Sequence, residues 1–86
     1  MTERRKDARR PADGVVELDV DGSARTRISG TLLDVSQAGF RVRHQCLSLG
    51  SGERVGYAYA GGTGRAMVMW TRVFGGEAES GLYRLE

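Results

Sequence analysis

The chain has 86 residues, a formal net charge of +2 and 40% hydrophobic residues. This length suits a single small domain, which leaves little room for a deep active site. A single cysteine, Cys46, excludes an internal disulfide, and no apolar run approaches the ~20 residues that span a bilayer. No apolar segment follows the charged N-terminus, so we expect a cytoplasmic domain without a secretory signal or a membrane span.

The first segment of the chain, residues 1–12, differs from the rest in charge. It holds five of the thirteen basic residues, Arg4, Arg5, Lys6, Arg9 and Arg10. It has no apolar periodicity, and Pro11 disfavours helical geometry at the residue before it. We therefore expect a flexible basic arm over 1–12 that meets phosphate, acidic protein or lipid, and a folded domain over 13–86.

From residue 15 the pattern has a period of two, which is typical of strands with one buried face. It predicts a first strand over 15–20, in which Val16 and Leu18 alternate with acidic residues. The Asp21-Gly22 pair predicts a hairpin turn. A second strand is expected over about 24–33, and Gly30 within it indicates a bulge or the close approach of another backbone.

The second half of the chain continues as short elements separated by turns. Residues 34–39, with the sequence Asp-Val-Ser-Gln-Ala-Gly, predict a turn, and alternation resumes at Phe40. We expect a loop at 44–52, a strand near 55–59, a hairpin at Gly61-Gly62 and an apolar strand over 66–73. A polar loop over 73–80 and a last strand over 81–85 complete the prediction.

These elements predict an all-β fold with six strands and no long helix. Thirteen glycines and one proline agree with many tight turns. A closed antiparallel β-barrel is favoured because closure removes exposed strand edges.

Two short motifs are candidates for function. The arm contains an RxxxR motif at Arg5 and Arg9, and residues 34–39 form a DxSxxG motif with Asp34, Ser36 and Gly39. Each motif alone is common by chance, but their combination in this order is more specific.

On these motifs the chain resembles the PilZ domain family. The similarity extends over nearly the whole chain, from Glu3-Arg4-Arg5 and Pro11 to Trp70, Arg72 and Gly81-Leu82. It implies a six-stranded antiparallel barrel of the split-barrel type that binds the bacterial second messenger cyclic di-GMP. In this family the arm crosses the ligand and the DxSxxG turn supports it from the barrel. Many relatives continue into a C-terminal helix where this chain stops, so no long C-terminal helix is expected.

The chemistry of the motif residues suits such a ligand. The planar fork of arginine pairs with phosphate oxygens or with guanine O6 and N7, so Arg5 and Arg9 can grip one ligand from two sides. An ionised Asp34 accepts from the donor edge of guanine. Ser36 offers a hydroxyl to a phosphate or to its own turn, and Gly39 supplies a positive φ angle or room for the ligand.

Other residues have secondary places in this hypothesis. By the same resemblance, Arg4 goes with a stacked dimer of the ligand, and Arg10 and Arg41 are possible auxiliaries. Trp70 is expected in the core rather than as a stacking platform. His44 and Cys46 lack further ligands, so no metal and no cofactor are expected. No catalytic arrangement is evident, and we expect a receptor rather than an enzyme.

Two alternatives remain open. A PilZ-like adaptor that binds an effector protein without nucleotide is compatible with the short C-terminus and the apolar strand 66–73. A barrel that binds nucleic acid fits the basic arm, but an aromatic content of 7% argues against it. In the leading hypothesis, the ligand orders the arm against the barrel.

Overall fold

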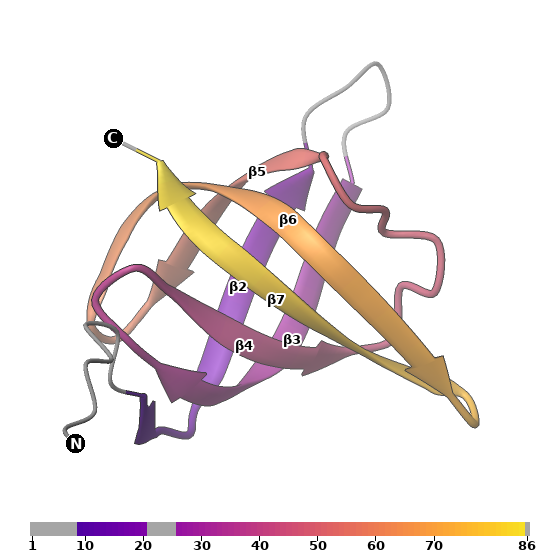
Figure 1. Ribbon diagram of the computed structural model, residues 1–86, viewed down its shortest axis with the longest axis horizontal. Helices are drawn as coiled ribbons and strands as arrows, with labels where there is room; N and C mark the ends of the chain where they lie inside the picture. The colour runs from indigo at the N-terminus through magenta and orange to yellow at the C-terminus, as the bar shows by residue number, and fades with distance from the viewer. Residues whose placement is uncertain (1–8, 21–25, 86) are drawn as a thin grey trace, which may run out of the picture.

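The computed structural model describes residues 9–20 and 26–85, which form an all-β fold (Figure 1). The strands are β1 (Arg10–Pro11), β2 (Val15–Val20), β3 (Thr26–Val35), β4 (Gly39–His44), β5 (Arg54–Tyr59), β6 (Gly62–Phe74) and β7 (Glu77–Leu85). These residues contain no helix, and hence no helix that could serve as a membrane span.

Six of the strands close into an antiparallel barrel. They pair in the order β3-β2-β5-β6-β7-β4, and β4 pairs back with β3. The two-residue strand β1 is additional and pairs with Asp34 and Val35 of β3. The predicted all-β, six-stranded antiparallel barrel is therefore confirmed, with one extra strand.

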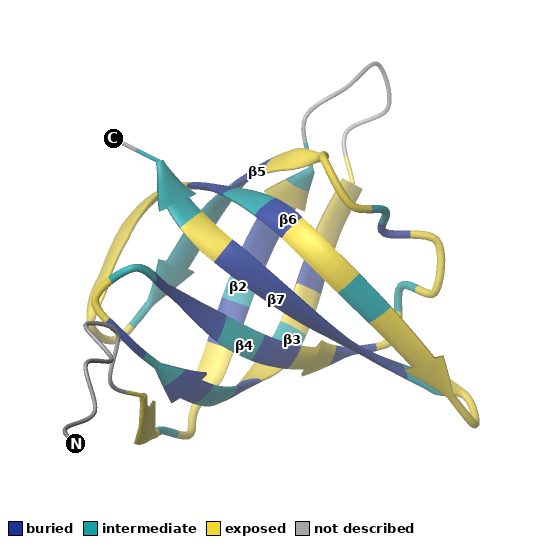
Figure 2. Cartoon of the chain, viewed as in Figure 1, coloured by how far each residue is buried: buried dark blue, intermediate teal, exposed yellow. Residues whose placement is uncertain are grey.

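The hydrophobic core fills the barrel because inward-facing and outward-facing residues alternate along each strand. Figure 2 shows this alternation as dark and light bands on β2 and β3. The side chains that are almost fully buried include Val16, Leu18, Phe40, Val42, Val55 and Val68. Burying an aliphatic or aromatic side chain contributes about 1.5–3 kcal/mol, so these residues are the main source of stability.

Two glycines lie where neighbouring strands approach closely. A Cβ atom at Gly30 would lie 2.7 Å from the carbonyl oxygen of Arg43 on β4, which confirms the expected close approach of another backbone. A Cβ atom at Gly39 would overlap the Leu82 carbonyl group on β7. Gly39 does not have a positive φ. The backbone of β7 occupies the space that the sequence suggested for a ligand.

The predicted polar loop over 73–80 is wrong. β6 and β7 instead form a long hairpin that turns at Gly75 and Gly76, with Phe74 paired to Glu77. Gly75 has a φ of +62°, which glycine adopts without strain. The sequence pattern did not indicate the first half of β7, because its inward-facing positions include Ser80, a polar residue that is fully buried.

The arm and the turn also differ from expectation. Residues 10 and 11 pair with β3, and the Ala12 N–H donates to the Leu33 carbonyl oxygen at 3.0 Å. These residues therefore do not stand apart from the barrel as the prediction for 1–12 required. Proline is tolerated at such an edge because its missing N–H need not pair. Asp34 belongs to β3 and Gly39 to β4, so only residues 36–38 form the turn.

Candidate functional site

Four charged side chains from three strands and the arm meet on the outside of the barrel. Asp34 on β3 and Arg41 on β4 are cross-strand partners, and Arg41 Nε donates to Asp34 Oδ2 at 2.8 Å. Arg41 Nη1 donates to Glu79 Oε2 on β7 at 2.9 Å. From the arm, Arg9 Nη1 donates to Asp34 Oδ1 at 2.9 Å. We call Arg9, Asp34, Arg41 and Glu79 the charged network.

Burial orders the charged network into two layers. The side chains of Asp34 and Glu79 are 9% and 10% exposed, whereas those of Arg9 and Arg41 are 40% and 36% exposed. The carboxylates therefore lie beneath the guanidinium groups, and the arginines face solvent. The buried Asp34 carboxylate is stable in this position because both of its oxygens accept charge-assisted hydrogen bonds, and Glu79 accepts one through Oε2.

The same contacts determine the protonation state of the charged network. Burial by itself would raise the pKa of Asp34, but the hydrogen bonds and positive charges of Arg41 and Arg9 outweigh it and lower that pKa. The hydrogen bond to Asp34 raises the pKa of Arg41. Asp34 and Arg41 are thus both charged at neutral pH, and the surface of the site presents cations.

The turn of residues 36–38 is held from two sides. The Ser36 hydroxyl oxygen accepts from the Gly39 N–H at 3.1 Å, and the Ser36 N–H donates to the Gly39 carbonyl oxygen at 2.8 Å. Arg84 on β7 donates through Nη1 to the carbonyl oxygens of Ser36 and Gln37. Ser36 therefore bonds to its own turn, which is one of the two roles predicted for it.

Trp70 lies on the outer surface, so its predicted place in the core is wrong. Val68 pairs with Leu82, but the next pair is Trp70 with Gly81, which makes Met69 the extra residue of a β-bulge. Without the bulge, Trp70 would face the core as Val68 does. The extra residue turns it outward, where its ring covers the Cα of Gly81.

A shallow hollow lies beside the charged network, between β4, β7 and β6. Its lining includes Arg9, Gly39, Trp70, Gly81 and Tyr83. The guanidinium carbon of Arg72 lies 5.3 Å from the centroid of the Trp70 ring, which is the geometry of a cation–π contact. The hollow therefore combines the Trp70 ring with Arg9 from the arm, and Arg72 lies over the same ring.

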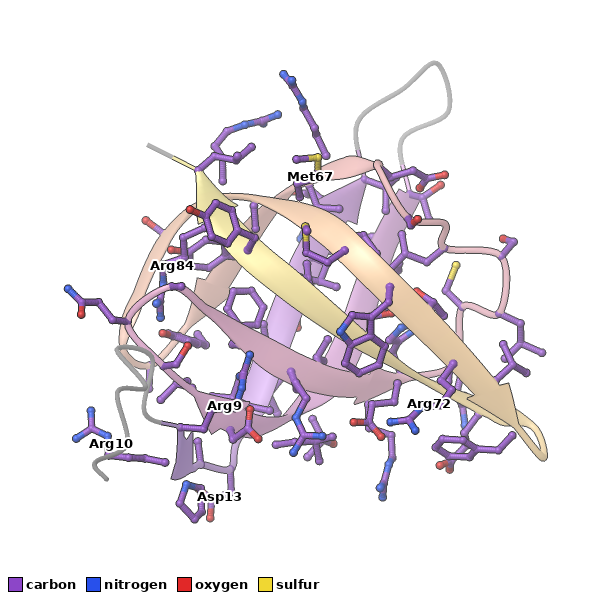
Figure 3. All side chains as sticks on the ribbon, in the orientation of Figure 1. Arg9, Arg10, Asp13, Met67, Arg72 and Arg84 are labelled. Atoms are coloured by element: carbon purple, nitrogen blue, oxygen red, sulfur yellow. The ribbon has the colours of Figure 1, made fainter. Side chains whose placement is uncertain are left out.

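The residues predicted for ligand binding have different places in this arrangement. Arg9, Asp34 and the auxiliary Arg41 belong to the charged network. Arg10 extends from β1 away from the barrel, whereas Arg9 is directed toward it (Figure 3). Arg4 and Arg5 lie outside the described residues.

His44 and Cys46 take part in a buried polar chain at the base of the β6–β7 hairpin. The Cys46 N–H donates to His44 Nδ1 at 3.1 Å, so His44 Nε2 carries the proton and donates to Ser80 Oγ at 2.7 Å. Burial lowers the pKa of His44. In the described part of the chain, no three His, Cys, Asp or Glu side chains gather in a way that could hold a metal ion.

Sequence reasoning missed two residues that support the site. Glu79 fell in the predicted loop 73–80, although the alternation of Glu77 and Glu79 with Ala78 and Ser80 could have indicated a strand. Arg84 gave no local signal, because the carbonyl groups it holds lie 48 and 47 positions earlier in the chain.

Comparison with models of known protein families and with curated proteins finds no match to this chain.

Proposed function

We propose that this protein is a PilZ-type receptor, a small bacterial cytoplasmic protein that binds cyclic di-GMP at the charged network and the neighbouring hollow. The observation that carries the proposal is the contact between Arg9 and Asp34. These residues belong to the RxxxR and DxSxxG motifs, lie 25 positions apart in the chain and are joined by a 2.9 Å hydrogen bond. The last residue of the first motif and the first residue of the second therefore meet on one surface.

The two solvent-facing arginines suit the phosphates of the ligand. Arg9 uses Nη1 for Asp34, and a guanidinium group has five N–H donors in total. Its remaining donors can pair with phosphate oxygens, and bidentate pairing of this kind is strong and directional. The carboxylates beneath the arginines hold them in place, which reduces the side-chain entropy that binding would otherwise cost.

The hollow beside the charged network suits a guanine base. Trp70 lines the hollow, and a base that takes the place of Arg72 over its ring would gain a stacking contact worth about 1–3 kcal/mol. The fork of Arg72 can also pair with guanine O6 and N7. In this arrangement Asp34 positions Arg9 and Arg41, because both of its oxygens already accept from them.

Calorimetric titration of the full chain with cyclic di-GMP tests the proposal. We expect binding, a loss of at least about tenfold in affinity for Arg9→Ala, and no binding of cyclic di-AMP, whose bases lack the guanine edge. A stacked ligand dimer predicts two molecules per chain, reduced to one by Arg4→Ala.

The matched control is Arg27→Ala, which removes an exposed arginine that pairs with Asp19 at 3.1 Å on another part of the barrel. This variant should bind like the unmodified chain. No heat at ligand concentrations of about 50 µM would contradict the proposal, as would equal losses in Arg9→Ala and Arg27→Ala.

The second candidate is an adaptor that binds an effector protein without nucleotide. The exposed apolar side chains of Met69, Val73 and Phe74 on β6 favour it. Recovery of an effector equally well with and without cyclic di-GMP, together with a flat titration, would support this candidate over the receptor.

A further inference from the structure

The outer half of β6 has one unpaired edge. β5 pairs with β6 only between Gly62 and Met67, and the loop residues Gly52 and Glu53 bond to Val68. From Met69 to Phe74, within the described residues, β6 pairs with β7 alone. We call the other side of residues 69–74 the open edge. Among residues 9–20 and 26–85, its backbone N–H and C=O groups have no strand partner, and the loop 47–51 forms the other wall of a groove along it.

The open edge lacks the features that usually protect a strand edge. Natural edges carry lysine, proline or inward-pointing charges, or they are very short. Residues 69–74 contain a single charged residue, Arg72, and no proline. Met69, Trp70, Val73 and Phe74 are all exposed, and the outer end of β6 is largely yellow in Figure 2. Unpaired backbone and exposed apolar side chains together favour docking by strand addition.

We propose that the open edge is a dimer interface, at which a second copy of this chain adds its own residues 69–74 in antiparallel register. A two-fold axis perpendicular to the sheet relates such strands, so one residue of each copy lies opposite itself. With Thr71 at the axis, Met69 lies opposite the second copy's Val73. Trp70 then lies opposite the second copy's Arg72.

The chemistry of this register argues for a second copy rather than a different protein. Met69 and Val73 are both exposed and line a groove with Leu47, so the pairing of Met69 with the second copy's Val73 is apolar. Across the same axis, each Trp70 meets the second copy's Arg72, which repeats the cation–π contact already present within one chain. The segment is therefore complementary to itself.

Neighbouring registers are less favourable. An axis at Arg72 would place two arginines directly opposite each other, which is destabilising. An axis at Trp70 would require Val68 to pair with the second copy, but its N–H and C=O groups already bond to Glu53 and Gly52. Of the centres at Trp70, Thr71 and Arg72, Thr71 avoids both problems.

This proposal does not depend on cyclic di-GMP, and sedimentation velocity of the full chain tests it. We expect a dimer that dissociates on dilution, and Val73→Lys should weaken dimerisation at least about tenfold because it puts a charge at the paired edge. Val15→Lys is the matched control, since Val15 is an exposed valine on β2, a strand that does not pair with β6. It should dimerise like the unmodified chain.

A charge-pair experiment tests the register. Met69→Glu and Val73→Lys should each be monomeric alone, and a mixture of the two should form a heterodimer because the new glutamate faces the new lysine. Circular dichroism of both variants verifies folding, and Met69→Glu carries the test should Val73→Lys not fold.

Three outcomes would overturn the proposal. The unmodified chain could remain a monomer up to about 1 mM, which would assign the open edge to a different partner. A dimer that Val73→Lys and Met69→Glu leave intact would have a different interface. A mixture of the two variants that stays monomeric would exclude pairing centred on Thr71.

Discussion

Two arginine–aspartate pairs on the outside of this barrel differ in their surroundings. Asp19 on β2 and Arg27 on β3 are cross-strand partners, and Arg27 Nε lies 3.1 Å from Asp19 Oδ1. The side chains of Arg27 and Asp19 are 68% and 54% exposed, respectively. Asp34 on β3 and Arg41 on β4 are also cross-strand partners, but Asp34 is buried and its second oxygen bonds to Arg9. Both pairs arise from the same sheet geometry. Burial and a second cation therefore separate a candidate site from an ordinary solvated ion pair.

The largest expected difference between the two pairs is in stability. Arg41→Ala would leave Asp34 and Glu79 buried without their shared cation, and we expect it to lower the free energy of unfolding by about 1–3 kcal/mol. Arg27→Ala removes an exposed pair and should change that free energy by less than about 0.5 kcal/mol. Urea unfolding of both variants at pH 7 measures the difference. Equal losses would show that burial does not distinguish the pairs.

The second difference is in the response to acid. Although burial opposes it, the contacts with Arg41 and Arg9 lower the pKa of Asp34 below its ordinary value of 3.8. A carboxyl with a lower pKa in the folded state stabilises the fold above its unfolded pKa, and this stabilisation is lost as the pH falls through the folded pKa. We therefore expect the stability of the unmodified chain to fall below about pH 4, and Asp34→Asn to reduce that fall. Unfolding free energies measured between about pH 3 and pH 7 check this. If they depend on pH equally in the unmodified chain and in Asp34→Asn, the loss of stability in acid does not come from Asp34.

The smallest expected difference is in the response to salt. The exposed pair of Asp19 and Arg27 is screened by mobile ions, so the effect of Asp19→Asn, at most about 0.5 kcal/mol in dilute buffer, should vanish in 1 M NaCl. The effect of Arg41→Ala should persist, because ions do not reach the buried carboxylates. Unfolding free energies at two salt concentrations check this, and an Arg41→Ala effect that also vanishes would argue against a buried network.

The barrel could be predicted because most of its strands have one apolar face. Val16 and Leu18 on β2, and Phe40 and Val42 on β4, alternate with polar residues as a half-buried strand requires. The start of β7 alternates too, but the sequence predicts a loop there because one of its inward-facing residues is Ser80, which bonds to Thr71 and His44 rather than to water. A polar residue whose partners come from other strands looks like a loop residue in the sequence.

The candidate site could be predicted only in part. The motifs identified Arg9 and Asp34, which the fold brings into contact. Trp70 was placed on the wrong side of the sheet because a single extra residue, Met69, reverses the alternation, and a bulge has no reliable local signal. The sequence suggested either a positive φ angle or room for a ligand at Gly39. Gly39 has no positive φ angle, and the backbone of Leu82 on β7 fills the space beside it.

The amino-acid sequence alone determines which segments become strands, where the tight turns lie and where the positive charge gathers, because these depend on residues near one another in the chain. Only the tertiary structure decides which polar groups are buried. The burial of Asp34 and Glu79 beneath Arg41 exists once β3, β4 and β7 are adjacent, and these residues lie up to 45 positions apart. The environment of a charge depends on neighbours that closure of the barrel supplies, and no local pattern encodes them.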